Sequence, residues 1–143
     1  MRPRAEPANL AARHGAWGEA LAVGLLRRKG YQIVARNIRP CPWDRRLELD
    51  IVAYDRQAGA IVFVEVKQHA RHVAGEARCR SVNRRKLHNV RRACAAWRLR
   101  NGWRGAFRFD IVEVYGVPGE APEIDHIERV ALFVSRERQV DWT

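Results

Sequence analysis

Two acidic residues and a lysine are spaced so that one face of a short sheet would carry all three. Asp50 stands in a run that alternates apolar and polar residues, while Glu65 and Lys67 end an almost continuous apolar run. Residues 55–60 between the two runs contain Gly59 and polar residues, which is typical of a turn. Folding the chain about this turn places Asp50 opposite Glu65, with Lys67 on the same face.

This combination suits the hydrolysis of a phosphodiester bond. Asp50 and Glu65 offer oxygen ligands to a hard divalent cation, Mg2+ or Mn2+, and the backbone carbonyl of Val66 is a third candidate ligand. The ammonium of Lys67 could orient or deprotonate an attacking water, or stabilise the charge of the transition state. The alternative is a structural ion pair between Glu65 and Lys67, with Asp50 capping a turn, because buried charges need partners.

Three further acidic residues are candidates for the same site. Glu19 lies four residues before Val23 on a buried stripe of the first expected helix, from which it could reach the cation. Glu48 shares the face of Asp50 and is a supporting candidate. Asp110 is the acidic residue of an otherwise apolar stretch in a later strand. It is either a supporting residue of the site or a structural acceptor.

The elements that must position these residues follow in the order helix, three strands, helix, strand, strand. Helices are expected over residues 10–29, ended by Gly30, and over about residues 81–100. Strands are expected over residues 31–36, 47–54, 61–66 and 107–115, and residues 124–135 are expected to supply a last strand at 130–135 after a short pairing segment. A short mixed sheet, with residues 61–66 as its central strand and a helix on each side, gives an α/β class and an α/β/α core.

Length and composition predict one folded domain. The chain has 143 residues, 47% of them hydrophobic, which is enough for a packed core. We expect a flexible tail over residues 1–8 and a single domain over residues 9–143. No apolar run approaches the ~18 residues of a membrane span, and the start lacks the apolar region of a secretory signal. Three widely spaced cysteines argue against a disulfide framework and favour the cytoplasm.

A formal charge of +11 indicates a polyanionic partner, most simply nucleic acid. Phosphate contacts are expected from a loop after the third strand and from the second helix: Arg71, Arg78, Arg80, Arg84, Arg85, Lys86, Arg91 and Arg92. Such contacts position a protein without reading base sequence, so structure-selective binding is expected. Trp43, beside Arg45 and Arg46, could stack on a base or simply anchor its loop. An Arg-rich solvated surface without such a partner is the alternative.

Several segments match a known pattern in the same order along residues 13–115. They are residues 15–19 (GAWGE), 30–37 (GYQIVARN), 48–53 (ELDIVA), 62–67 (VFVEVK), Lys86 and 108–114 (RFDIVEV). Together they resemble the YraN-like family, small bacterial proteins grouped by fold with the PD-(D/E)XK nucleases, near the Holliday-junction resolvases. The departures lie in the loop before Glu48, which is longer than usual and lacks a glycine, and at His69, where a basic residue is common.

The resemblance implies a restriction-endonuclease-like α/β/α core. By motif position, Asp50, Glu65 and Lys67 would be the catalytic set, with Glu19 as an additional acidic member. The expected function is a Mg2+-dependent endonuclease acting on DNA, with branched DNA as one class of substrate and a homodimer as one way to cut two strands. The alternatives are a non-catalytic nucleic-acid-binding module with the same fold and a protein-interaction domain whose basicity is incidental.

Overall fold

The computed structural model describes residues 7–70 and 84–131. Its elements are α1 (Pro7–Arg28), β1 (Tyr31–Ile38), β2 (Leu49–Asp55), β3 (Ala60–His69), α2 (Arg84–Asn101), β4 (Phe107–Tyr115) and β5 (Glu123–Ile127). The predicted order of elements is confirmed. The last described strand, β5, lies where the short pairing segment is expected and pairs with β4. Of the predicted strand over residues 130–135, Val130 and Ala131 have no regular structure and the remainder lies outside the described residues.

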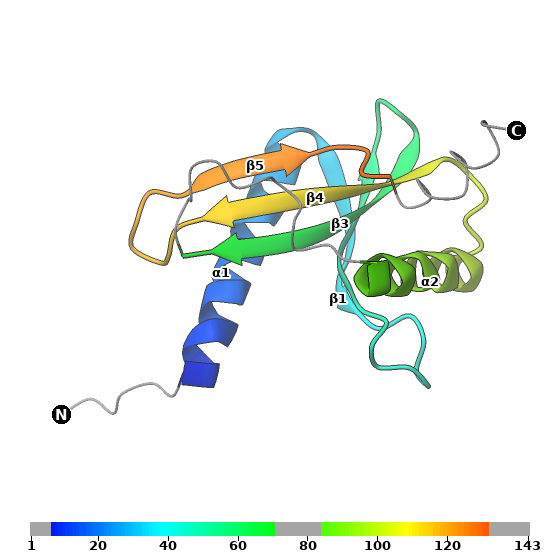
Figure 1. Cartoon of the computed structure of the whole chain (residues 1–143). Helices are drawn as coiled ribbons and strands as arrows, with labels where there is room; N and C mark the ends of the chain where they lie inside the picture. Colours follow the sequence, from blue (N-terminus) through cyan, green and yellow to red (C-terminus); the bar gives the residue numbers. More distant parts are fainter. Residues whose placement is uncertain (1–6, 71–83, 132–143) are drawn as a thin grey trace, which may run out of the picture.

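The strands form one mixed sheet in the order β1-β2-β3-β4-β5 (Figure 1). Neighbouring strands are antiparallel except β3 and β4, which are parallel. The parallel pair follows from α2, which lies between β3 and β4 in the chain and returns it to the end where β3 began. As predicted, β3 is the central strand.

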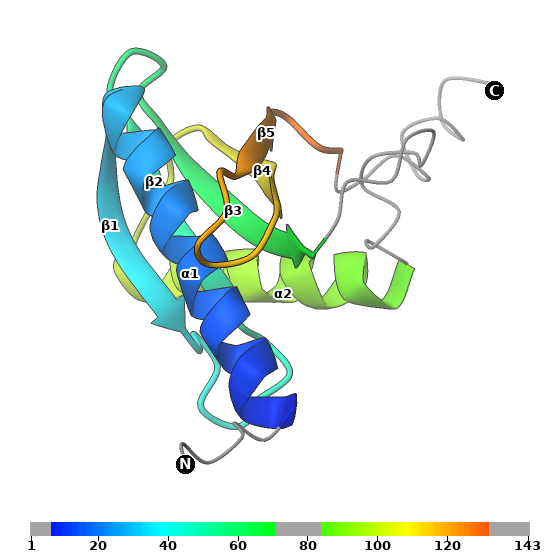
Figure 2. The same cartoon turned by 90° about the vertical axis from the view of Figure 1, so that its left-hand side faces the viewer.

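The two helices cover opposite faces of the sheet (Figure 2). On one face, α1 packs Ala22, Val23 and Leu26 against alternate residues of the strands, Ile51, Ala53, Val62, Val64, Val112 and Val114. On the other face, α2 packs Val90, Cys94 and Trp97 against Val52, Phe63, Phe109 and Ile111. The architecture is therefore the expected α/β/α arrangement, consistent with a restriction-endonuclease-like fold.

Two glycines fit α1 to the sheet. A Cβ at Gly18 would lie 3.1 Å from the Cβ of Gln68, so a residue without a side chain lets the helix cross β3 closely. Gly30 has φ of 88°, a left-handed conformation that ends the helix and turns the chain into β1. In the described part of the chain, neither helix is long and apolar enough to cross a membrane.

Candidate functional site

The register of β2 and β3 brings Asp50 and Glu65 together. The last ladder pair is Ile51 with Val64, so one further step along both strands sets Asp50 opposite Glu65, as predicted. Past that pair, the backbone N–H of Val66 donates to Oδ2 of Asp50 at 2.9 Å. The Asp50 carboxyl therefore lies between the two strands, where the regular ladder stops.

The surroundings of Asp50 disfavour its negative charge. Burial, followed by the Glu65 carboxylate, raises the pKa of Asp50 to about 7, although the N–H of Val66 acts in the opposite direction. The charges of Glu19 and Glu48 raise this pKa further. Desolvation and the neighbouring negative charges both destabilise the ionised form of Asp50. A positive charge that reaches this carboxyl group would therefore stabilise it.

Glu65 is paired with two lysines. Its Oε1 lies 3.2 Å from the Nζ of Lys67, two residues along β3, and 2.6 Å from the Nζ of Lys86 on α2. The Glu65 side chain is only 12% exposed, so these pairs form largely out of water. We call Asp50, Glu65, Lys67 and Lys86 the pocket cluster.

The two lysines of the pocket cluster differ in their proton affinity. Burial, together with the neighbouring Lys86 amine, lowers the pKa of Lys67. Burial also acts against the charge of Lys86, but its contacts with Glu65 and Lys67 outweigh this and raise its pKa. Lys67 is therefore the amine that more easily becomes a neutral base, and Lys86 is the one that keeps its charge.

A pocket of about 300 Å³ opens beside the pocket cluster, between the start of β2 and the helix α2. It is lined by Arg46, Glu48, Asp50, Glu65, Lys86, Asn89 and Val90. Acidic oxygens and basic nitrogens thus face one cavity, on the face of the sheet that α2 covers. This arrangement can receive a cation and a phosphate together.

The donor set fits a hard divalent cation. Asp50 and Glu65 supply carboxylate oxygens from neighbouring strands, and both ammonium contacts of Glu65 are to Oε1. Burial and, after it, the nearby Glu65 carboxylate raise the pKa of Asp50, and a cation between the two carboxylates would relieve their repulsion. The residues that would hold Mg2+ or Mn2+ are thus Asp50 and Glu65, with the carbonyl of Val66 as a further candidate.

Glu19 lies at the margin of the site. Its Oε1 accepts hydrogen bonds from Nδ2 of Asn37 at 2.9 Å and from Nε of Arg36 at 3.3 Å, at the end of β1. The side chain is 12% exposed, in keeping with the predicted buried stripe, and its charge acts on Asp50. Glu19 therefore adds negative charge to the site while its carboxylate is held by β1.

The predicted phosphate-binding residues have different positions. Arg71, Arg78 and Arg80 lie outside the described residues, and the side chains of Arg84 and Arg85, at the start of α2, are likewise outside them. Lys86 faces Glu65 in the pocket. The guanidinium of Arg92 donates to Oδ2 of Asp44 at 3.2 Å, and Arg91 is half-buried on α2.

Sequence reasoning missed three residues of this region. Arg46 and Asn89 line the pocket, and Asn89 could have been found because it lies one helical turn after Lys86. Glu113 is 3% exposed and pairs with Lys67 in the parallel ladder, so it extends the charged face of the sheet. Its Oε2 accepts a hydrogen bond from the Tyr115 hydroxyl at 2.5 Å.

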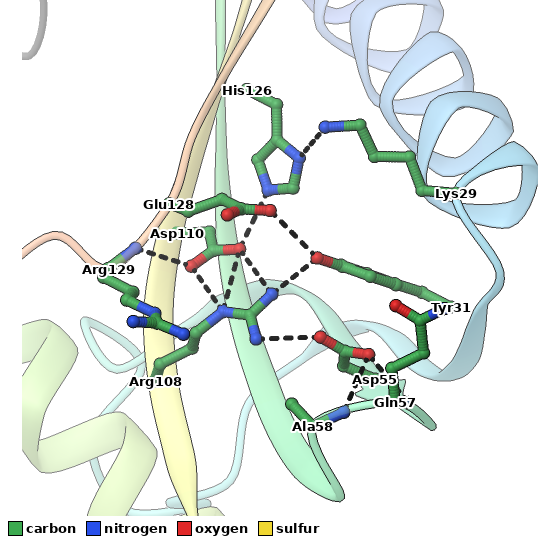
Figure 3. Close-up of polar contacts among 10 residues, drawn as sticks. All are labelled: Lys29, Tyr31, Asp55, Gln57, Ala58, Arg108, Asp110, His126, Glu128 and Arg129. Carbon is green, nitrogen blue, oxygen red and sulfur yellow. Dashed lines mark hydrogen bonds and ion pairs between the residues drawn. The ribbon is translucent and has the colours of Figure 1, made fainter.

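Asp110 is the centre of a second polar cluster, on the face that α1 covers (Figure 3). It is fully buried and accepts hydrogen bonds from Nε of Arg108 at 3.1 Å and the backbone N–H of Arg129 at 3.0 Å. Nε2 of His126 lies 2.8 Å from its Oδ2. Burial acts to raise the pKa of Asp110, but these hydrogen bonds outweigh it and the pKa is lowered.

Arg108 extends this cluster across the sheet. Its guanidinium donates to Oδ2 of Asp55 at 3.0 Å and to the Tyr31 hydroxyl at 2.6 Å. Lys29, at the end of α1, lies 2.8 Å from Nδ1 of His126. We call this cluster the Asp110 network; its residues are Lys29, Tyr31, Asp55, Arg108, Asp110, His126, Glu128 and Arg129.

The Asp110 network also contains a set of potential metal ligands. Within the described ranges, Asp110, His126 and Glu128 are the group of three whose donor atoms all lie within 4.8 Å of one another. The Tyr31 hydroxyl donates to Oε1 of Glu128 at 3.1 Å, and Arg108 and Lys29 place positive charge beside the other two. Of the two roles predicted for Asp110, these contacts favour the structural one.

Comparison with known proteins identifies a family to which this chain is similar. The model of the uncharacterised protein family UPF0102 matches residues 18–114. A UPF0102 protein of Trichlorobacter lovleyi is 40% identical over 114 residues, which are 79% of this chain and 85% of that protein. One from Nocardia farcinica is 40% identical over 117 residues, covering 81% and 87%. One from Mycobacterium tuberculosis is 36% identical over 120 residues, covering 81% and 90%.

Proposed function

The chain belongs to the uncharacterised protein family UPF0102, and we propose that it is a metal-dependent endonuclease that hydrolyses DNA phosphodiester bonds. One observation carries the proposal. Two carboxyl groups from neighbouring strands, Asp50 and Glu65, line a pocket of about 300 Å³ together with Lys86, and Lys67 pairs with Glu65 beside it. A merely structural ion pair needs neither a second lysine nor a carboxyl group whose pKa is raised to about 7.

Each residue of the pocket cluster has a role in this reaction. Asp50 and Glu65 would hold Mg2+ or Mn2+, which when bound supplies a Lewis acid for the phosphate oxygens. Lys67, whose pKa is lowered, would take the proton of the attacking water. Lys86, whose pKa is raised, would keep a positive charge next to the transition-state phosphate.

The proposed substrate follows from the net charge of the protein, and the proposed assembly follows from the number of DNA strands to be cut. A formal charge of +11 supports DNA as the partner, held by phosphate contacts rather than by base recognition. Arg46 at the pocket and the basic residues of α2 are the proposed contacts. Cutting both strands of a branched DNA needs two sites, so a homodimer is part of the proposal.

The test is nicking of a labelled branched DNA in Mg2+ or Mn2+. Asp50→Asn and Lys67→Met are expected to lower the rate about a hundredfold or more, because they remove a ligand oxygen and the proton acceptor. The control is Glu123→Gln, which changes an exposed carboxylate on β5 and should cleave like the wild type. Equal rates in all four proteins would rule out catalysis by the pocket cluster.

Metal and DNA binding separate the alternatives. A calorimetric titration with Mn2+ that finds no site, in a protein that still binds DNA, would indicate a non-catalytic module. DNA affinity that is absent, or that barely changes with salt, would indicate a protein-interaction domain instead, because phosphate contacts release counterions.

A further inference from the structure

Trp43 is exposed although its loop is firmly attached to the protein. The loop joins β1 to β2, and the Trp43 side chain is 82% exposed. Trp97 is buried, and Trp17 and Trp103 are half-buried. Trp43 thus differs from the other tryptophans in the described part of the chain, and it does not anchor its loop.

Other residues fix the conformation of this loop. Cys41 and Leu47 are 6% and 1% exposed and pack into the cluster under α2. The N–H of Asp44 donates to the carbonyl of Cys41 at 3.1 Å, and the N–H of Leu47 donates to the carbonyl of Asp44 at 3.2 Å. Arg100 of α2 donates to the carbonyl of Pro40 at 3.1 Å. The indole is therefore held out from the surface by a hydrogen-bonded turn with buried ends.

Asp44 joins the loop to the pocket and to α2. Its carboxylate accepts two hydrogen bonds from the Arg46 guanidinium, both at 3.0 Å, and one from Arg92 at 3.2 Å. The hydrogen bonds with Arg46 hold the pKa of Asp44 well below its usual range. Arg46 also lines the pocket that contains Asp50 and Glu65. Trp43 is thus only three residues from a guanidinium of the candidate site.

An exposed indole beside exposed guanidinium groups matches one ligand chemistry. Arg45 is exposed and the Arg46 side chain is 73% exposed, so the loop carries exposed positive charge two and three positions after Trp43. Aromatic side chains stack on nucleobases whatever the base, while arginines bind the phosphates of the same strand. Within a duplex both faces of a base are already stacked, so the indole can reach a base only where the stacking is interrupted.

We propose that Trp43 stacks on an unpaired nucleobase at a fork, gap or junction and thereby selects such DNA for the pocket that Arg46 lines. This inference rests on the proposed function and deepens it, because it assigns the choice of substrate structure to one side chain. The phosphates of the stacked strand would run past Arg45 and Arg46 toward the pocket cluster.

The test measures DNA binding without any metal, in EDTA, so that no cleavage is involved. Fluorescence anisotropy compares a labelled duplex with a forked DNA of the same sequence. Trp43→Ala is expected to weaken binding to the fork about tenfold, the loss of one stacked base, and to leave duplex binding within about twofold. Trp43→Phe should restore most of the fork affinity, because it keeps an aromatic face.

A matched control and the remaining outcomes make the test decisive. Leu99→Ala changes a side chain on α2 that is 85% exposed and should bind both DNAs like the wild type. Equal weakening of fork and duplex by Trp43→Ala, or no weakening, would overturn the inference and leave the proposed nuclease intact. Wild-type protein that binds neither DNA would contradict the proposed function as well. A lower mass of Trp43→Ala in solution would instead place Trp43 between two copies of the chain.

Discussion

The pocket cluster and the Asp110 network are two groups of charges on opposite faces of one sheet. In the Asp110 network, a fully buried carboxylate has three partners and its pKa is lowered. In the pocket cluster, the described residues give Asp50 one backbone donor and its pKa is raised to about 7, beside a pocket of about 300 Å³. The difference shows that one fold can use a buried carboxylate to hold its elements together at one place. At another place it can leave a carboxyl group open to a ligand.

Asp110→Asn should have the largest effect on stability. The change removes the charge that Arg108 and His126 contact, leaving buried groups without their partner, so we expect a loss of about 3–5 kcal/mol in the free energy of unfolding. Because the pKa of Asp110 is lowered, its contribution is present at neutral pH and is lost as the pH falls through the folded-state pKa. Urea denaturation at pH 7 measures the loss, and the difference from wild type should shrink in acid. Wild-type stability at pH 7 would remove the structural role.

Asp50→Asn should have the opposite effect and raise the free energy of unfolding. Because the pKa of Asp50 is raised from 3.8 to about 7, ionisation of this group destabilises the fold as the pH rises through that interval. The amide keeps an oxygen for the Val66 N–H without the charge, so we expect a gain on the order of 3 kcal/mol at pH 8. The gain should fall to roughly 1 kcal/mol at pH 5. A variant that is less stable than the wild type at pH 8 would make Asp50 a structural residue like Asp110.

Lys86→Met should change metal binding more than stability. The Lys86 ammonium lies 2.6 Å from Oε1 of Glu65, where it competes with an incoming cation for the carboxylate. Removing it should tighten Mn2+ binding about tenfold, as expected for one charge at close range in a partly buried site. Calorimetry measures the affinity, and Lys29→Met, which removes an amine from the Asp110 network, is the matched control. Equal affinities in both variants would mean that Lys86 does not compete with the metal.

The sequence was sufficient for the part of the site that depends on strand geometry. Period-two alternation and a turn containing Gly59 predicted that Asp50 faces Glu65, and the register confirms it. Helical spacing from Val23 and Leu26 predicts that Glu19 lies on a buried stripe, and its side chain is 12% exposed in the structure. These features are local, because they depend on a strand period, a helix period and one turn.

The rest of the site depends on tertiary contacts, which the periodicity of a helix or a strand does not predict. Lys86 lies in an arginine-rich helix, where the sequence predicts a phosphate contact, but only the rotation of α2 over the sheet shows that it also contacts Glu65. The partners of Asp110 are even less accessible to sequence reasoning. Arg108 reaches Tyr31 across 77 positions of the chain, and Lys29 reaches His126 across 97. The end of α1 must dock on the sheet before these groups become neighbours.

The scarcity of lysine gives the two clusters a chemical consequence. Lysine occurs only at positions 29, 67 and 86, and all three side chains belong to the pocket cluster or the Asp110 network. Amine-selective acylating reagents therefore have few side-chain targets, of which Lys29 is exposed, because guanidinium groups stay protonated. Lys67, with its lowered pKa, is the lysine whose neutral amine is most available to such a reagent. Acylation at Lys67, located by mass spectrometry, would thus report whether the ion pair of Lys67 with Glu65 is intact.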